Sequence, residues 1–254
     1  METQSIISGR LYLSTEINLP LVDDACWKKK ALIDFSIKLE NNFFPCPFGR
    51  KAWVKKSILY LFCEKQHFNE YDDFLSGMKA FTCFVKTKKI KDRILSPLVT
   101  FFSGDFYQRS KQHDAGWSAL NYIHRYDPLP WPKDIPLSPE DNKWSFCFNG
   151  VQLFINMSSY EHKILHSRNL GRHLTFVINP RENFDIVANL KSKGGRKIRE
   201  KIRTKVSIYN CGIVSKELGF YGAEDNKEWQ QYQLEEEGIT RPTRCPFKKF
   251  ISKK

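Results

Sequence analysis

An Asn-Gly pair between two apolar runs constrains the fold of this sequence more than any other feature. The segment KWSFCFNGVQLFIN, residues 143–156, places Asn149 and Gly150 between the runs WSFCF and VQLFIN. Asn-Gly is a preferred sequence for a two-residue type I′ turn, whose twist matches that of the strands on either side. The segment therefore predicts a β-hairpin. A hairpin this apolar needs further strands or helices to cover it.

Other strands and helices follow from composition and periodicity. Runs rich in aromatic and β-branched residues predict strands at residues 57–64, 81–87, 98–103 and 173–179. Periodic or helix-prone segments predict helices at residues 22–40, 69–79, 107–126, 183–190 and 195–209. Asp23 or Asp24 would cap the first helix, and a loop over residues 41–49 would follow it. Because strands and helices do not alternate strictly, we expect an α+β fold with a mostly antiparallel sheet and flanking helices.

No internal repeat or low-complexity linker divides the chain of 254 residues. We therefore expect a single domain over residues 1–240. Pro242, Pro246 and several lysines and arginines follow, which predicts a basic, loose tail over residues 241–254.

The excess of positive charge predicts an anionic binding partner. Lys and Arg number 41 against 28 Asp and Glu, a formal net charge of +13. The densest basic run covers residues 191–205, where a helix could grip phosphates. A solvated amphipathic helix explains the same run. It is the favoured interpretation, because no helix-turn-helix, RNP motif or zinc finger accompanies the charge. Nucleic acid is therefore a disfavoured partner.

The absence of particular sequence motifs disfavours several classes of protein. Charged residues interrupt every apolar window long enough to span a membrane. Glu2 stands where a secretory signal would be basic, and the seven cysteines are widely spaced, so we expect a cytoplasmic protein with reduced thiols. The sequence has no GxxxxGK[ST], GxGxxG or GxSxG pattern. Nucleotide hydrolysis, nicotinamide binding and serine-esterase chemistry are disfavoured.

Two local features could carry chemistry. His162 and His166 have the spacing of a two-histidine metal site, but Lys163 stands where the HExxH motif of metalloproteases has its glutamate base. Cys46 lies between Pro45 and Pro47, close to basic side chains that would favour a thiolate. It could be a nucleophile, a redox thiol or a metal ligand. A small buried hydrophobe in a tight loop is an equally good interpretation.

Several fragments in order resemble the YqcI/YcgG family, which includes haem-dependent N-hydroxylases. They are FPCPFGRKA (44–52), WSALNYIHRYD (117–127) with WP (131–132), WSFCFNGVQLFIN (144–156), HKILHSRNLG (162–171), TFVINPRENFD (175–185), REKIR (199–203) and EWQQY (228–232). The resemblance implies a haem b cofactor, O2 activation at its iron, and transfer of oxygen to an amino or guanidino nitrogen.

The resemblance also implies roles for particular residues. His162 is the first choice as axial iron ligand. His124 is the second choice, or a catalytic group on the distal side that hydrogen-bonds O2. A thiolate ligand from Cys46 stays open. Arg168, Arg172 and Arg181 would be counter-ions for the haem propionates, and Trp117 would form part of the pocket wall. Asp127 and Glu182 are candidate carboxylates for a cationic substrate group.

Three functions follow. The first is a haem-dependent oxygenase that N-hydroxylates a small amino-acid-like substrate, with O2 and an external electron donor. The alternatives are a non-catalytic haem-binding carrier or sensor and a basic nucleic-acid-binding protein.

Overall fold

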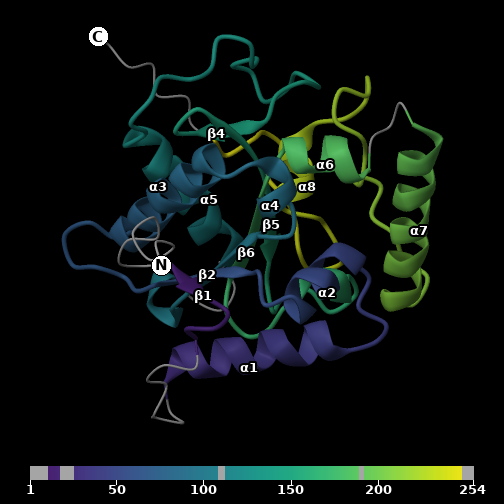
Figure 1. The fold of residues 1–254 in the computed structure, drawn as a ribbon, viewed down its shortest axis with the longest axis horizontal. Helices are drawn as coiled ribbons and strands as arrows, with labels where there is room; N and C mark the ends of the chain where they lie inside the picture. Colours follow the sequence, from purple (N-terminus) through teal and green to yellow (C-terminus); the bar gives the residue numbers. More distant parts are fainter. Residues whose placement is uncertain (1–10, 18–25, 108–111, 189–191, 248–254) are drawn as a thin grey trace.

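A computed structural model describes residues 11–17, 26–107, 112–188 and 192–247 (Figure 1). The strands are β1 (Tyr12–Leu13), β2 (Leu59–Cys63), β3 (Leu98–Phe102), β4 (Phe146–Phe148), β5 (Val151–Ser158) and β6 (Thr175–Pro180). The helices are α1 (Trp27–Glu40), α2 (Pro47–Val54), α3 (Asp72–Thr87), α4 (Ile90–Arg93), α5 (Gln112–Arg125), α6 (Glu182–Val187), α7 (Lys193–Tyr209) and α8 (Glu228–Tyr232). Short 3-10 turns cover Gly104–Phe106 (η1) and His166–Arg168 (η3).

The strands form one open sheet in the order β1-β2-β3-β6-β5-β4. Neighbouring strands are antiparallel except β2 and β3, which are parallel. The predicted α+β fold with a mostly antiparallel sheet is therefore confirmed. Among the described residues, no helix is long and apolar enough to cross a membrane.

The predicted hairpin is confirmed. Phe148 of β4 pairs with Val151 of β5, and Asn149 and Gly150 between them have φ angles of 50° and 71°. Both angles fall in the left-handed region that a type I′ turn requires. The backbone N–H of Asn149 donates to a carboxylate oxygen of Asp127 at 2.9 Å, which ties the turn to the end of α5.

The strand predicted at residues 81–87 is wrong, because these residues form the second half of α3. Phe74, Met78, Phe81 and Val85 recur at steps of four, three and four, and all are buried. Packing of this helical face outweighs the β propensity of the segment FTCFVKT. The helix is also part of the connection between two neighbouring strands of the sheet. Parallel neighbours such as β2 and β3 need a crossover connection, and α3 and α4 provide it.

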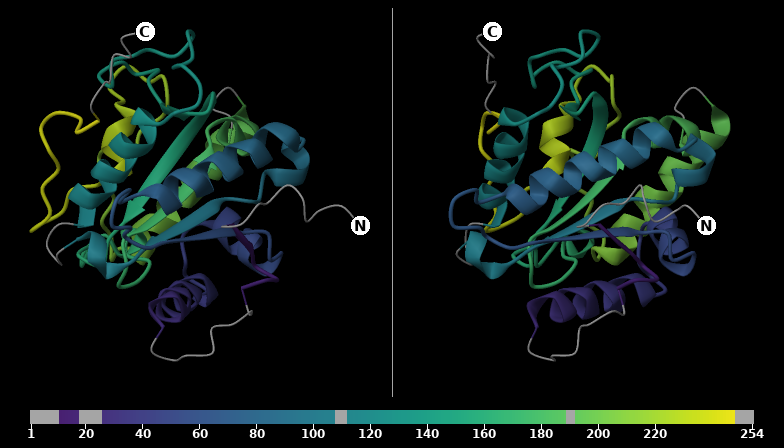
Figure 2. Two further views of the ribbon diagram at one scale, coloured as in Figure 1. Left: turned by 90° about the vertical axis from the view of Figure 1, so that its left-hand side faces the viewer. Right: turned by 60° about the vertical axis from the view of Figure 1, so that its left-hand side comes forward.

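The sheet separates two hydrophobic cores. The larger core lies between the sheet and helices α3 and α5, and the smaller one between the sheet and helices α1 and α2. Along β6 the side chains alternate, so that Phe176 and Ile178 enter the larger core while Val177 packs against the smaller one. Figure 2 shows α1 well separated from α3 by the sheet.

Three segments refine the sequence expectations. The expected loop over residues 41–49 ends earlier, because α2 begins at Pro47. Asp23 and Asp24, the expected caps of the first helix, lie outside the described residues, and α1 begins at Trp27. In the C-terminal segment, Phe247 is buried in the larger core, and residues 248–254 lie outside the described part of the chain.

Candidate functional site

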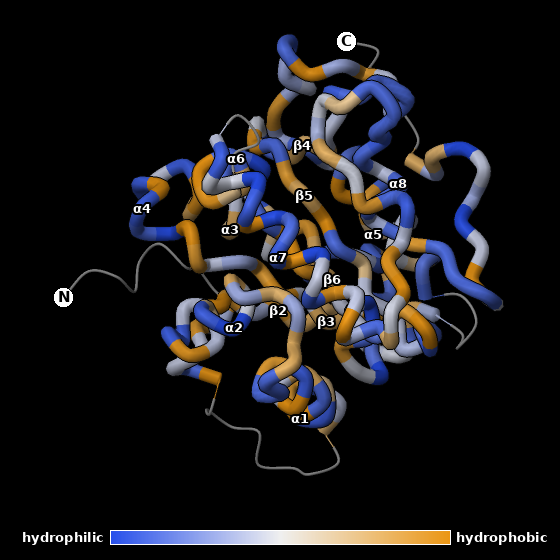
Figure 3. The backbone as a smooth tube through the Cα atoms, turned by 90° about the vertical axis from the view of Figure 1, so that its right-hand side faces the viewer, coloured by the Kyte–Doolittle hydropathy of each residue, from blue (hydrophilic) through white to orange (hydrophobic). Residues whose placement is uncertain are grey.

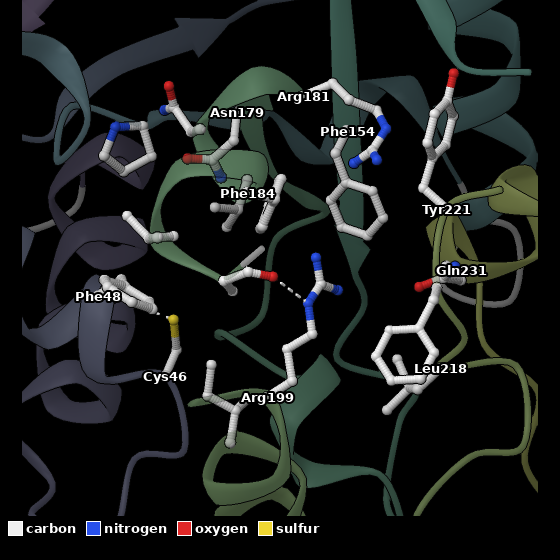
Figure 4. A pocket seen from close by; sticks show the side chains of 18 of the residues that line it. Cys46, Phe48, Phe154, Asn179, Arg181, Phe184, Arg199, Leu218, Tyr221 and Gln231 are labelled. Atoms are coloured by element: carbon white, nitrogen blue, oxygen red, sulfur yellow. Dashed lines mark hydrogen bonds between the residues drawn. The ribbon is translucent and has the colours of Figure 1, made fainter. Parts of the chain in front are cut away.

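A cavity of about 310 Å³ lies on the α2 side of the sheet. Its volume is at the lower end of the range typical of ligand pockets. It is lined by residues of β5, β6, α2, α6, α7, α8, η3 and the loop at residues 218–221, with mostly apolar side chains. Figure 4 shows Cys46 and Phe48 on one side of the cavity and Arg181 and Tyr221 on the other. The polar groups that interrupt the apolar wall are a thiol, four arginines, a carboxyl group, three side-chain amides and the phenol of Tyr221. We call this the arginine-lined cavity.

Cys46 places its thiol in this cavity from the N-terminus of α2. Its side chain caps the helix, and Sγ accepts the backbone N–H of Gly49 at 3.3 Å. Pro47 at the first helical position favours a helix start here, because its missing N–H would be unpaired in any case. Burial raises the pKa of the thiol, against the opposing effect of the backbone N–H groups of Gly49 and Phe48. Cys46 is therefore a neutral thiol in this structure, held in one orientation by the helix end.

Four arginines line the cavity, and two of them are almost fully buried. Arg168 of η3 is 5% exposed, and its Nη1 has no hydrogen-bond partner among the described residues. Burial lowers the pKa of Arg168 to about 10. A guanidinium removed from water without a partner is costly, so Arg168 fits a cavity that takes an anionic group.

The other three arginines are fixed by packing. The guanidinium carbon of Arg181 lies 3.5 Å from the ring centre of Tyr221, and that of Arg203 lies 4.3 Å from the ring centre of Phe220. Arg199 donates from Nε to the carbonyl of Ala188 at 2.6 Å. Each remains positively charged while its orientation is restricted, which makes this wall of the cavity strongly cationic.

Glu228 at the start of α8 is the carboxyl group in the wall. It is 1% exposed, and one of its oxygens accepts the Tyr232 hydroxyl at 3.0 Å. Its other oxygen lies 3.4 Å from Nε of Arg181. Burial raises the pKa of Glu228 to about 7, although Arg181 opposes this shift. A carboxyl group with this pKa changes protonation state near neutral pH.

His162 lies in a buried polar cluster next to the cavity-lining Arg168, whose charge contributes to lowering the pKa of His162. Its Nδ1 is 2.9 Å from Glu236, which also accepts the backbone N–H groups of Lys163, Ile164 and Leu165. Glu236 therefore fixes the ring with Nδ1 protonated and Nε2 as the acceptor. That Nε2 is buried and has no hydrogen-bond partner among the described residues. Burial lowers the pKa of His162. His162 is not among the residues that line the arginine-lined cavity.

A second histidine accompanies His162. The ring of His113 in α5 lies 5.4 Å from the ring of His162, centre to centre, at an angle of 74°. Burial and the neighbouring His162 lower the pKa of His113 to about 3. Its Nε2 also lacks a hydrogen-bond partner in the described part of the chain. No group of three metal-ligating side chains exists among the described residues, so this pair lacks the third protein ligand of a typical zinc site.

His124 and Trp117 both lie on α5, across the sheet from the cavity, and neither lines it. The ring of His124 packs 4.6 Å from that of Phe247 and 5.7 Å from that of Trp131. Trp117 donates from Nε1 to Gln233 at 2.7 Å and stacks on Tyr232. Both residues contribute to the packing of the larger core.

The remaining candidates make structural contacts outside the cavity. Arg172 is exposed and forms a bidentate ion pair with Asp34 of α1, at 2.7 and 2.9 Å. Glu182 pairs with Arg93, Asp127 holds the hairpin turn, and His166 is exposed on η3. The structure thus brings Cys46, Arg168 and Arg181 together and places the other predicted residues elsewhere.

Several residues of the site were not predicted from the sequence. Arg199 and Arg203 were grouped with a solvated basic helix, but they face the cavity beside Ile202. Ile198 on the same helix is 36% exposed. Helical periodicity places Arg199 and Arg203 along one edge, next to Ile202, but only the fold shows that this edge faces a cavity. One sequence feature could have identified Glu228 as a site residue, namely its position in the family-like fragment EWQQY. No sequence feature identified His113 as a site residue, because its partner His162 is 49 residues away along the chain.

Comparison with known proteins identifies the family of this chain. The profile of the YqcI/YcgG family matches residues 35–248. The chain belongs to the YqcI/YcgG family. The match spans α1 to Phe247, so the whole arginine-lined cavity and the His113–His162 cluster lie within the family region.

Curated relatives share most of their length with this YqcI/YcgG member. A Streptomyces lavendulae protein named "Putative N(omega)-hydroxy-L-arginine synthase DcsA" is 38% identical over 227 residues, covering 87% of this chain and 84% of the relative. The Bacillus subtilis proteins YcgG and YqcI, both named as uncharacterized, are 29% and 28% identical over 212 and 215 residues. The alignment with YcgG covers 82% of YcgG and 82% of this chain. The alignment with YqcI covers 83% of YqcI and 83% of this chain. No solved structure matches.

Proposed function

We propose that this protein is an enzyme that N-hydroxylates a small arginine-like substrate with O2, using haem b bound in the arginine-lined cavity. One observation carries the proposal: a single cavity combines the Cys46 thiol, four arginines and the buried carboxyl group of Glu228. The similarity to a relative named as an N-hydroxyarginine synthase supports the substrate class. The family resemblance supports the cofactor.

The side chains of the cavity include the kinds of group that haem needs, but haem and an amino acid together are larger than its volume of about 310 Å³, so the cavity would have to widen on binding. Haem needs an axial ligand, an apolar surface for the porphyrin and cations for two propionates. Cys46 offers a sulfur ligand whose Sγ already accepts a backbone N–H, and such hydrogen bonds tune a thiolate ligand. Arg168 has an unpaired guanidinium nitrogen for an anionic group. Of the three candidate ligands, Cys46 lines the cavity, whereas His162 and His124 do not. We therefore assign iron ligation to Cys46 in this proposal, and binding would release the thiol proton.

Bound in this cavity, haem would supply the binding and activation of O2. The chain itself would position the substrate. Glu228 is the acidic side chain in the wall, and its carboxylate, oriented by the Tyr232 hydroxyl, would receive the cationic guanidino group. The cationic wall would receive the substrate carboxylate. The apolar side chains of Phe154 and Phe184 would limit the access of water.

Turnover of a defined substrate tests the proposal. We would load the purified protein with haem b and supply O2 and a chemical or protein reductant. L-arginine, L-citrulline and L-lysine would be compared, with products identified by mass spectrometry. We expect L-arginine to gain one oxygen atom on a guanidino nitrogen and L-citrulline, which lacks the cation, to react poorly. A protein that holds haem but converts neither arginine nor another amino-acid amine would contradict the proposal.

A further inference from the structure

A cationic ligand would meet four arginines in the arginine-lined cavity. Like charges repel strongly in a buried site, because the effective dielectric constant there is low. A cation that only added its charge to this wall would therefore bind weakly. Glu228 is the carboxyl group among the described residues that line the cavity, so its protonation state decides how a cation is received.

Glu228 is buried beside a positive charge that does not hydrogen-bond to it. One oxygen of Glu228 lies 3.4 Å from Nε of Arg181, but that nitrogen makes no hydrogen bond among the described residues. The guanidinium of Arg181 stacks on the ring of Tyr221, and its Nη2 lies 3.7 Å from the exposed Asp185. Arg181 therefore shares its charge between two carboxyl groups. Because a buried carboxylate needs paired charge and hydrogen bonds in place of water, this arrangement favours a proton on Glu228.

Two hydroxyl groups lie behind Glu228, between α8 and β5, which Figure 3 shows beside each other. Oη of Tyr232 lies 3.0 Å from Glu228 and 3.0 Å from the carbonyl oxygen of Leu153, and it accepts the backbone N–H of Phe146 at 3.2 Å. A phenol has one proton, so it donates to one of the two oxygens at a time. The hydroxyl of Ser145 lies 3.3 Å from the same Leu153 carbonyl and also hydrogen-bonds Glu228.

This network satisfies either protonation state of Glu228. When Glu228 is protonated, its O–H can donate to the phenol of Tyr232, which then donates to the carbonyl of Leu153. When Glu228 is ionised, the phenol turns to the carboxylate, and Ser145 donates to the carbonyl. Buried polar groups keep hydrogen-bond partners in both states. A proton can therefore leave Glu228 while only hydroxyl hydrogens move.

The other titratable groups that face Glu228 do not take up its proton. Burial is the main cause that raises the pKa of Glu228, Arg181 opposes it, and Asp185 adds to it. Burial also raises the pKa of three neighbours, which are therefore neutral near pH 7: Cys147 of β4, Tyr221 and Tyr232. A change of charge at this end of the cavity therefore involves Glu228 itself.

Resting on the proposed function, we infer that Glu228 exchanges its proton for the cationic group of the ligand, and that Tyr232 is the positioning residue for this exchange. An opposite charge within about 4–6 Å favours the ionised form of a carboxyl group. A guanidinium or ammonium group that reaches Glu228 therefore displaces the proton to solvent, and the total charge of the cavity stays the same. Affinity for the cation should rise about tenfold per pH unit wherever the free protein holds this proton.

Isothermal titration calorimetry of the purified protein, with and without haem b, tests the inference. L-arginine and the neutral L-citrulline would be titrated at pH 6 and pH 8 in buffers of different ionisation enthalpy, because the buffer dependence of the heat counts the protons released. Infrared difference spectra would follow the C=O band of the protonated carboxyl group. The variants are Glu228→Gln and Tyr232→Phe. The control is Glu237→Gln, an exposed glutamate that does not line the cavity.

We expect about one proton to be released per arginine bound at pH 6, much less at pH 8, and none with citrulline. The C=O band should disappear when arginine binds, be absent from Glu228→Gln, and be unchanged in Glu237→Gln. Tyr232→Phe removes a donor to the carboxylate, so proton release should persist at pH 8 and arginine should bind more weakly at pH 6 than at pH 8. A purely structural defect would weaken binding equally at both pH values.

Arginine binding without proton release at pH 6, or equal release from the wild type and Glu228→Gln, would overturn the inference and leave the proposed substrate in place. Guanidinium chloride at low concentration separates the two proposals. If guanidinium removes the C=O band but arginine is neither bound nor hydroxylated, the exchange stands and the proposed function fails. If neither cation binds, both fail.

Discussion

Glu228 lies 3.4 Å from the guanidinium Nε of Arg181, and both side chains are almost completely buried in the wall of one cavity. The two residues come from α8 and from the start of α6, 47 positions apart in the sequence. Their contact gives the cavity one carboxyl group among four arginines. A site of this composition can bind a molecule that carries both a cation and an anion, as an amino acid does.

Glu228→Gln should change how stability depends on pH. Burial raises the pKa of Glu228 from its ordinary 4.5 to about 7 in the folded protein. Between these values the folded state holds a proton that the unfolded state has released, so the contribution of Glu228 to stability falls as pH rises. Urea unfolding at pH 5 and pH 8 should show the variant gaining stability relative to wild type at the higher pH. The exposed Glu140→Gln serves as the control. A relative loss for Glu228→Gln at pH 8 would show that Arg181 holds the carboxylate charged.

His113 should remain neutral in mildly acidic solution. Burial and His162 lower its pKa to about 3. Below the ordinary pKa of 6.5 the unfolded chain binds a proton that the folded protein does not, so stability should decrease as pH falls from 6.5 towards 3. The ¹⁵N chemical shifts of the imidazole nitrogens report the charge state directly. We expect His113 to be neutral at pH 5. A protonated His113 at pH 5 would disprove the buried cluster as described.

Gly77→Ala should destabilise the fold. A Cβ at this position in α3 would lie 2.3 Å from a methyl carbon of Leu61 in β2. Overpacking of this kind costs about 1–3 kcal/mol, so the free energy of unfolding should fall by that amount. Gly104→Ala is the matched control, because its Cβ would meet no atom within 4 Å. Equal stability of the two variants would mean that α3 does not approach the sheet this closely.

Arg168→Gln should weaken haem binding, whereas Arg172→Gln should not. Arg168 lines the cavity and has an unpaired nitrogen, while Arg172 is exposed and paired with Asp34. Hydrogen bonds to charged groups contribute about 1.5–3 kcal/mol, so haem should transfer to apomyoglobin about tenfold faster, or more, from the Arg168 variant. The same transfer rate for both variants would place the propionates elsewhere.

The sequence predicted those parts of the fold that short segments decide. The Asn149-Gly150 turn and the strands at 57–64 and 98–103 depend on local composition, and the structure has all of them. The prediction of a strand at residues 81–87 was wrong because the helical state of this segment depends on packing against β2 and on the crossover to β3. The same distinction applies to the site. Family-like fragments identified Cys46, Arg168 and Arg181, but no local pattern could show that Glu228 joins them or that His162 faces Glu236 instead.

The visible absorption spectrum of the haem-loaded protein tests the central claim most directly. With haem b bound through Cys46, the reduced protein should form a carbon monoxide complex with the strongly red-shifted Soret band that marks thiolate ligation. Cys46→Ser should lose that band, and His162→Gln should keep it. Failure to bind stoichiometric haem, or a histidine-type spectrum that Cys46→Ser leaves unchanged and His162→Gln abolishes, would contradict the account.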